Sequence, residues 1–88
     1  MNIKTIHLID HREITTIPVY YGRFLRIRGA TPGAKFKIQF NDIDTSQIDI
    51  QIGRTGYYEY DADGNNYISA ITINPQYTGT IEIGQYGQ

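Results

Sequence analysis

The side chains best suited to chemistry lie near the start of the chain, in a segment that holds both histidines of the protein. Four of them offer nitrogen or oxygen ligands of the kind that bind zinc: His7, Asp10, His11 and Glu13. Histidines four residues apart share a face only in a helix, whereas this segment has the pattern of a strand that runs into a turn. We therefore interpret it as a solvated turn. The chain has no cysteine, which excludes thiolate ligands and disulfides, and no nucleophile motif accompanies the histidines.

A second group of oxygen ligands lies in the segment 61–66, whose spaced carboxylates are typical of the start of a calcium loop. An EF-hand loop beginning at Asp61 needs glycine and glutamate where this chain has Asn66 and Thr72. The Asp-Gly and Asn-Asn pairs tolerate left-handed backbone, so we interpret the segment as a hairpin turn. Glu59 and Asp61 share a strand face, but nothing else supports acid–base catalysis there. The sequence thus predicts no catalytic residue, no metal and no cofactor, and hence a protein that is not an enzyme.

Cationic side chains are densest in the middle of the first half of the chain, where they alternate with aromatic residues. The basic set consists of Arg23, Arg26, Arg28, Lys35 and Lys37. Basic groups beside Tyr20, Tyr21 and Phe24 resemble a single-stranded nucleic-acid surface. The pI of about 6.0 argues against nucleic acid as a partner. Two interpretations remain, a contact face between subunits and an ordinary solvated face.

The charges are divided unevenly along the chain. Residues 1–40 hold seven Lys and Arg against two Asp and Glu, a net +5, whereas residues 41–88 hold one against seven, a net −6. Basic and acidic strands that lie beside each other in one sheet would explain this division. Opposite faces of unlike charge, on which copies dock head to tail into a ring, would explain it as well.

Tyrosine is used eight times, and three of the eight cluster within four positions: Tyr57, Tyr58 and Tyr60. In a strand, Tyr58 and Tyr60 share a face and Tyr57 takes the other. A tyrosine ring buries a large area while its hydroxyl stays polar, which suits three roles. The cluster is interpreted as core and rim packing, as a protein interface, or as a platform on which sugars stack.

The elements that must position these residues are all strands, because isoleucine, threonine and tyrosine recur at every second position between short turns. Eight strands are predicted, at 3–9, 14–21, 23–28, 35–40, 47–52, 57–61, 67–73 and 79–83. Pro18 predicts an edge or a bulge in the second of them. Pro32-Gly33 predicts a type II turn that joins 23–28 and 35–40 into a hairpin. We expect one all-β domain over residues 1–88, an antiparallel β-sandwich in jelly-roll order with no significant helix.

Several of these segments, taken in order, resemble small structural proteins of tailed bacteriophages and prophages. The resemblance lies in Phe24 to Ile27, the Pro32-Gly33 turn, the strand that ends at Asn41, the strand that ends at Gly53, and the isoleucine strands that close on Gly84. The segment 53–59 also resembles a Gly-Thr-Gly-Tyr-Glu element of prophage structural proteins. The resemblance covers residues 20–84, and residues 1–19 match nothing in that family.

The resemblance implies a structural role on a virion, as a capsid decoration or accessory subunit or a piece of tail or fibre attachment. The protein would then act by adhesion, as multiple copies bound to each other or to a larger capsid or tail protein. The interface would comprise the basic set together with Tyr57, Tyr58 and Tyr60. The alternative is a carbohydrate-binding module that uses these tyrosines. We expect a virion location after assembly in the host cytoplasm, since neither a signal peptide nor a membrane span is apparent.

Overall fold

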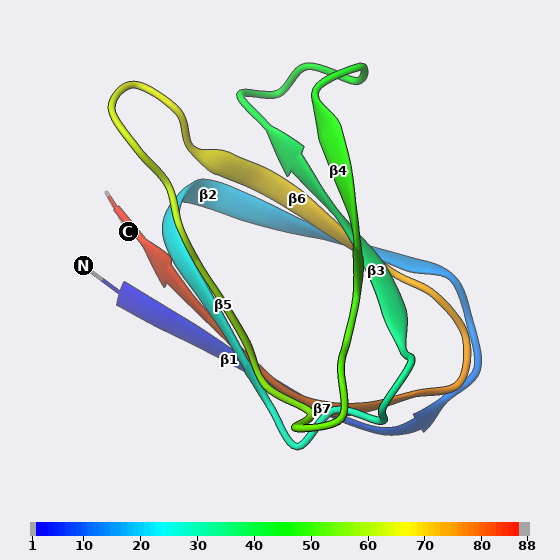
Figure 1. Cartoon of the computed structure of the whole chain (residues 1–88). Coiled ribbons are helices and arrows are strands. Elements are labelled where there is room, and N and C mark those ends of the chain that lie inside the picture. Colours follow the sequence, from blue (N-terminus) through cyan, green and yellow to red (C-terminus); the bar gives the residue numbers. More distant parts are fainter. Residues whose placement is uncertain (1, 87–88) are drawn as a thin grey trace.

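The computed structural model describes residues 2–86 as seven antiparallel strands, with no helix in that range (Figure 1). The strands are β1 (Asn2–His11), β2 (Thr15–Arg28), β3 (Lys35–Phe40), β4 (Gln47–Gln51), β5 (Tyr58–Asp61), β6 (Ile68–Ile73) and β7 (Tyr77–Gln85). The all-β prediction is therefore confirmed. All seven strands belong to one sheet in the order β1-β7-β2-β6-β3-β4, with β5 paired to β2. The finer prediction of a β-sandwich in jelly-roll order is not confirmed, since the seven strands form one sheet.

Strand β2 holds the two parts of this sheet together. Its first part pairs with β6 at residues 15–18, and its second part pairs with β5 and β7 at residues 24–27. The pairing with β6 shifts register between Pro18 and Gly22, as the proline predicted, and Tyr21 there has a φ of 45°. A bulge bends the strand that carries it and lets it pass from one part of a sheet to another. Figure 1 shows β2 turning sharply at this point.

The bend accounts for the difference between eight predicted strands and seven observed ones. The segments 14–21 and 23–28 were predicted as separate strands because Gly22 stands between them. They form one continuous strand, since Gly22 itself pairs with Ile68 of β6 and with Gln85 of β7. A glycine inside a strand marks a bulge or a close approach of backbone as readily as a strand end.

The predicted hairpin between 23–28 and 35–40 is wrong. The turn at its centre is present, because Ala34 N donates to Thr31 O at 3.0 Å and Gly33 has a φ of 85°. The strands on either side separate, however, and β3 pairs with β4 and β6 instead of β2. Backbone bonds draw the connection toward other strands: Ala30 N donates to Gly56 O, and Thr31 N donates to Thr78 O. The segment 61–66 likewise makes its turn, but it joins β5 and β6, which both pair with β2 and not with each other.

The core lies between the two parts of the folded sheet. Its inward side chains alternate along each strand and are completely or almost completely buried: Leu25 and Ile27 of β2, Phe36 and Ile38 of β3, Ile71 and Ile73 of β6, and Ile81 and Ile83 of β7. Aromatic pairs join β3 to β5 across this core, with ring centroids 5.6 Å apart for Phe36 and Tyr58 and 5.4 Å apart for Phe40 and Tyr60. These contacts hold the short strand β5 against the other part of the sheet.

Tyr77 is the largest fully buried side chain, and its hydroxyl has no hydrogen-bond partner among the described residues. Burial raises the pKa of Tyr77 from 10.0 to about 12. Between these two values the unfolded chain has lost a proton that the folded chain still holds, so folding stability falls as the pH rises. Below pH 10 the folding stability does not depend on the ionisation of Tyr77.

We therefore expect the urea midpoint to drop between pH 10 and 12, and Tyr77→Phe to drop less over the same range. At pH 7 the same substitution removes an unpaired buried hydroxyl, so we expect it to leave stability unchanged or raise it by about 1 kcal/mol. Urea unfolding at a series of pH values measures both effects. A variant whose midpoint falls as steeply as that of the original chain would show that Tyr77 is not responsible.

Candidate functional site

The predicted basic set does not form one free face, because three of its members pair with acidic residues of the same chain. The ion pairs join Arg26 to Glu59 (3.7 Å), Arg28 to Glu82 (2.7 Å) and Lys37 to Asp49 (4.0 Å). Arg26 lies directly opposite Glu59 and Lys37 directly opposite Asp49 in antiparallel ladders, and Arg28 is the diagonal neighbour of Glu82, so the opposite charges are favourable. The division of charge along the sequence thus corresponds to basic strands that lie beside acidic ones.

The predicted tyrosine cluster is divided between the core and the surface. The rings of Tyr58 and Tyr60 are half-buried and pack against the core, as described above, and burial raises the pKa of Tyr58. Tyr57 is exposed, and its hydroxyl donates to a carboxylate oxygen of Glu59 at 2.9 Å, which raises the pKa of Tyr57. These three residues therefore do not present a common stacking platform.

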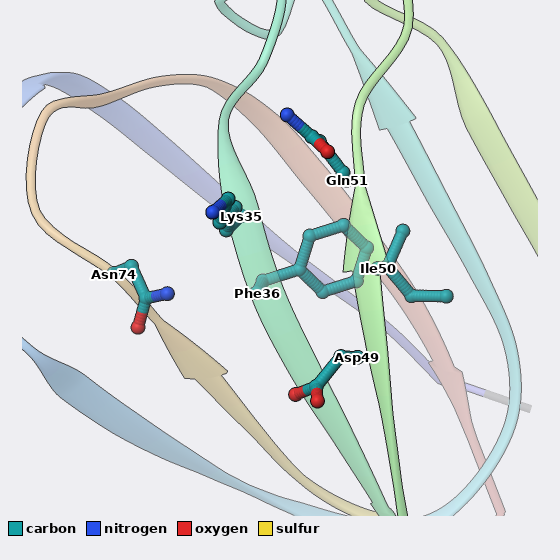
Figure 2. Close-up of a pocket in the computed structure, with 6 residues that line it drawn as sticks. All are labelled: Lys35, Phe36, Asp49, Ile50, Gln51 and Asn74. Carbon is teal, nitrogen blue, oxygen red and sulfur yellow. The ribbon is translucent and has the colours of Figure 1, made fainter.

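Lys35 lies in a hollow beside β3 and β4, with a volume of about 410 Å³ (Figure 2). The hollow is lined by Lys35, Phe36, Asp49, Ile50, Gln51 and Asn74. In Figure 2 the polar ends of Lys35, Asp49 and Asn74 lie apart from one another. A binding pocket for a small molecule requires a few convergent polar groups, and this arrangement lacks them.

A different aromatic surface forms at the bend of β2. We call it the tyrosine patch, and it consists of Tyr20, Tyr21, Tyr67, Tyr86 and Arg23. Rings from two places in the sequence meet there: centroids are 4.8 Å apart for Tyr20 and Tyr21 and 4.6 Å apart for Tyr21 and Tyr67. The ring of Tyr86 is linked to them through Arg23, whose guanidinium lies 5.7 Å from its centroid. Nearly half of the surface of Tyr20, Tyr21 and Tyr86 is exposed to solvent. The patch is thus an exposed aromatic surface with a cation at its side.

The bulge in β2 creates this surface. Successive residues of a regular strand point to opposite faces, so Tyr20 and Tyr21 would be separated by the sheet. The left-handed conformation of Tyr21, which costs about 1–2 kcal/mol for such a residue, turns its ring to the same side as Tyr20. Strained residues at positive φ concentrate at functional sites, so the conformation of Tyr21 makes the patch a candidate site.

Hydrogen bonds hold the members of the patch in place. The guanidinium of Arg23 donates to the backbone oxygens of Asn66 (2.6 Å) and Ala62 (3.3 Å), and it lies 5.7 Å from the ring centroid of Tyr86. The Tyr86 amide donates to Tyr21 O at 3.2 Å. Arg23 is therefore the member of the basic set that belongs to an aromatic surface.

Two residues that follow β3 hold Tyr67 in place through hydrogen bonds. The Tyr67 hydroxyl donates to an Asp42 carboxylate oxygen at 2.9 Å, which raises the pKa of Tyr67, and its amide donates to the Asn41 side chain at 2.9 Å. Asn41 and Asp42 both have positive φ, and the Asp42 amide donates to the hydroxyl of Ser69 at 3.0 Å. A network of this kind holds the ring of Tyr67 in one position.

Sequence reasoning named Tyr20 and Tyr21 as neighbours of the basic set but did not identify the patch. Two consecutive tyrosines in a strand were the available signal, because one of them must face solvent if the other faces the core. Nothing in the spacing of Tyr67 or Tyr86 indicates that they approach Tyr21, since they lie 46 and 65 positions further along the chain.

The histidines predicted to lie outside any metal site make hydrogen bonds to threonines. His7 contacts the hydroxyl of Thr80 at 3.2 Å, and His11 contacts that of Thr15 at 2.8 Å. Within residues 2–86, no three His, Cys, Asp or Glu side chains gather as a metal site would require. In the same range no helix has the length and apolar character needed to cross a membrane.

Comparison of the chain with models of protein families, with characterised proteins and with solved structures finds no match.

Proposed function

We propose that this protein is a non-enzymatic adhesion subunit of a phage virion, which works in multiple copies and binds a larger capsid or tail protein. The observation that supports adhesion is the tyrosine patch: exposed rings and an arginine held in place at the bend of β2. Tyrosine and arginine are, with tryptophan, the residues most enriched among those that dominate the energy of protein interfaces. The virion assignment rests on the resemblance of residues 20–84 to small phage structural proteins.

The patch suits adhesion because its side chains are already ordered. Immobilising a flexible side chain at an interface costs about 0.5–1.5 kcal/mol. Arg23 and Tyr67 are held by hydrogen bonds within the chain, so a partner that covers them avoids part of this cost. The ion pairs that engage Arg26, Arg28 and Lys37 within the chain support a contact made through apolar anchors more than through unpaired charges.

Co-sedimentation of the chain with purified particles of the phage that encodes it tests this proposal. We expect Tyr20→Ala with Tyr86→Ala to reduce the amount bound at least tenfold, since the loss of one interface anchor costs about 2 kcal/mol or more. Tyr57→Ala is the matched control, because Tyr57 is exposed to a similar degree but lies outside the patch. Absence of the chain from the particles, or an equal loss in the control, would overturn the proposal.

A carbohydrate-binding module is the second candidate. It is favoured by the exposed rings of Tyr20, Tyr21 and Tyr86, because each tyrosine offers an apolar ring face together with a polar hydroxyl. The chain contains no tryptophan, so tyrosine fluorescence reports directly on such binding. Quenching by cell-wall polysaccharide that disappears in the double patch variant would support this candidate over protein adhesion. A signal that does not change on titration would exclude it for that polysaccharide.

A further inference from the structure

Three of the described strands each pair with only one other strand. Strand β1 pairs only with β7, β4 only with β3, and β5 only with β2. Unpaired edges invite another strand, and natural proteins discourage this with charged side chains. On β4 the solvent-facing side chains include Asp49, and on β5 they include Glu59 and Asp61. On β1 the exposed positions carry no Lys, Arg, Asp or Glu between residues 3 and 9.

The exposed face of β1 is instead apolar at both ends. Its odd-numbered side chains are Ile3, Thr5, His7 and Ile9, all exposed, with Ile3 59% and Ile9 86% accessible. Ile3 lies opposite Gly84, which has no side chain to cover it. The one lysine of this stretch, Lys4, reaches away from the edge to the backbone oxygen of Pro18 at 3.4 Å. The edge is therefore not protected by charge.

The backbone groups of residues 3, 5 and 7 point away from β7. The backbone N–H and C=O groups of even-numbered residues along β7 point toward β2 and the segment after it. This follows because Tyr86 N donates to Tyr21 O and Thr78 O accepts from Thr31 N. Odd-numbered residues of β7 then face β1, where Ile81 lies opposite Ile6. Backbone groups alternate in direction along a regular strand, so those of residues 3, 5 and 7 face outward. Ile9 lies at the register shift between Leu8 and His11, at the end of this regular stretch.

We propose that β1 pairs with β1 of a second copy, antiparallel about a two-fold axis at Ile6. In this register Ile3 of each copy lies opposite Ile9 of the other, so the exposed isoleucines cover each other. Thr5 lies opposite His7 of the second copy, and both of these residues present outward backbone groups, as the pairing requires. The arrangement is self-complementary, as a two-fold contact must be. It joins two sheets into one through β1.

This inference deepens the self-association part of the proposed function and rests on it only for its biological role. It uses residues outside the tyrosine patch, so the two proposals fail separately. A dimer whose patch variants still bind particles would contradict particle attachment through the patch and leave the β1 pairing intact. A chain that attaches to particles but stays monomeric in solution would do the reverse.

Sedimentation equilibrium of the complete chain measures the first consequence. We expect the mass to rise with concentration from 10.1 kDa to twice that value. Ile3→Lys with Ile9→Lys should abolish this rise, whereas Ile43→Lys should not, because Ile43 is an exposed isoleucine in a loop far along the chain. Circular dichroism would verify that both variants stay folded. A chain that remains monomeric at every concentration, or a double variant that still dimerises, would overturn the proposal.

Disulfide trapping tests the register of this pairing. The chain has no cysteine of its own, so only the introduced cysteines can form a disulfide. The Cα atoms of a hydrogen-bonded antiparallel pair are about 5.5 Å apart, within the range that a disulfide spans. We expect Thr5→Cys and His7→Cys proteins to cross-link when mixed and oxidised, and neither to cross-link well alone. Strong cross-linking of His7→Cys alone would place the axis at residue 7 and contradict the register centred on Ile6.

Discussion

Replacing Gly22 with alanine is expected to destabilise the protein by about 3 kcal/mol, at the upper end of the range for overpacked cores. A Cβ atom at position 22 would lie 2.7 Å from a methyl carbon of Val19 and 2.9 Å from both the Cβ and the backbone oxygen of Ile68. The oxygen belongs to a ladder and cannot move independently, so β2 and β6 must separate where β2 bends. A domain of 88 residues has a total stability of roughly 4–13 kcal/mol.

Gly53→Ala is the matched control, because nothing lies within 4 Å of the Cβ that it adds. We expect its stability to stay within about 0.5 kcal/mol of the original chain, or to rise slightly through the loss of freedom in the unfolded state. Urea unfolding of both variants measures the difference in their free energies of unfolding, provided that their m-values are equal. If Gly22→Ala unfolds at the original midpoint, the bend of β2 is not as tightly packed as described.

Replacing Phe36 with alanine is expected to cost about 3–5 kcal/mol, the range found for buried aromatic residues. The ring is 1% exposed, and its edge meets Tyr58 across the core, so the substitution removes both core volume and the contact that holds β5. Because β5 pairs with β2 alone, we also expect its amides to lose hydrogen-exchange protection before those of β6.

Phe24→Ala separates this effect from the loss of any aromatic ring. Phe24 lies on the solvent-facing side of β2, half-buried, with its ring 5.6 Å from the Arg26 guanidinium. We expect the substitution to cost less than about 1.5 kcal/mol, as is usual for surface positions. Comparable losses for the two variants would mean that the core between β3 and β5 contributes less than its burial suggests.

Strand content followed from local pattern alone. Ile48 and Ile50 alternate with Gln47, Asp49 and Gln51, and that period of two is a property of the chain itself. The turn at Pro32-Gly33 was equally predictable, since proline fixes φ and glycine permits the positive value that follows. The bulge near Pro18 was predictable for the same kind of reason, because a missing donor interrupts a ladder wherever it falls.

Strand pairing did not follow from the sequence, because a turn determines only how the chain reverses locally. Whether β3 pairs with β2 or with β6 depends on which arrangement buries Phe36, Ile38, Leu25 and Ile27 together. That comparison involves the whole sheet. The observed strand pairing places Arg26 beside Glu59. The Arg26 charge, which the sequence suggested for docking, is therefore engaged in an ion pair within the chain. We accordingly propose the interface at the tyrosine patch, whereas the sequence predicted the basic set together with Tyr57, Tyr58 and Tyr60.

The sequence by itself determined the class of this protein: an all-β chain with no cysteine, with isoleucine strands and with tyrosines in excess. The tertiary structure decided which tyrosines are available. Tyr58 and Tyr60 pack against the core, while Tyr20, Tyr21, Tyr67 and Tyr86 gather at the bend of β2. The physical reason is that periodicity assigns a residue to one face of its own strand, whereas exposure depends on what the folded sheet places against that face.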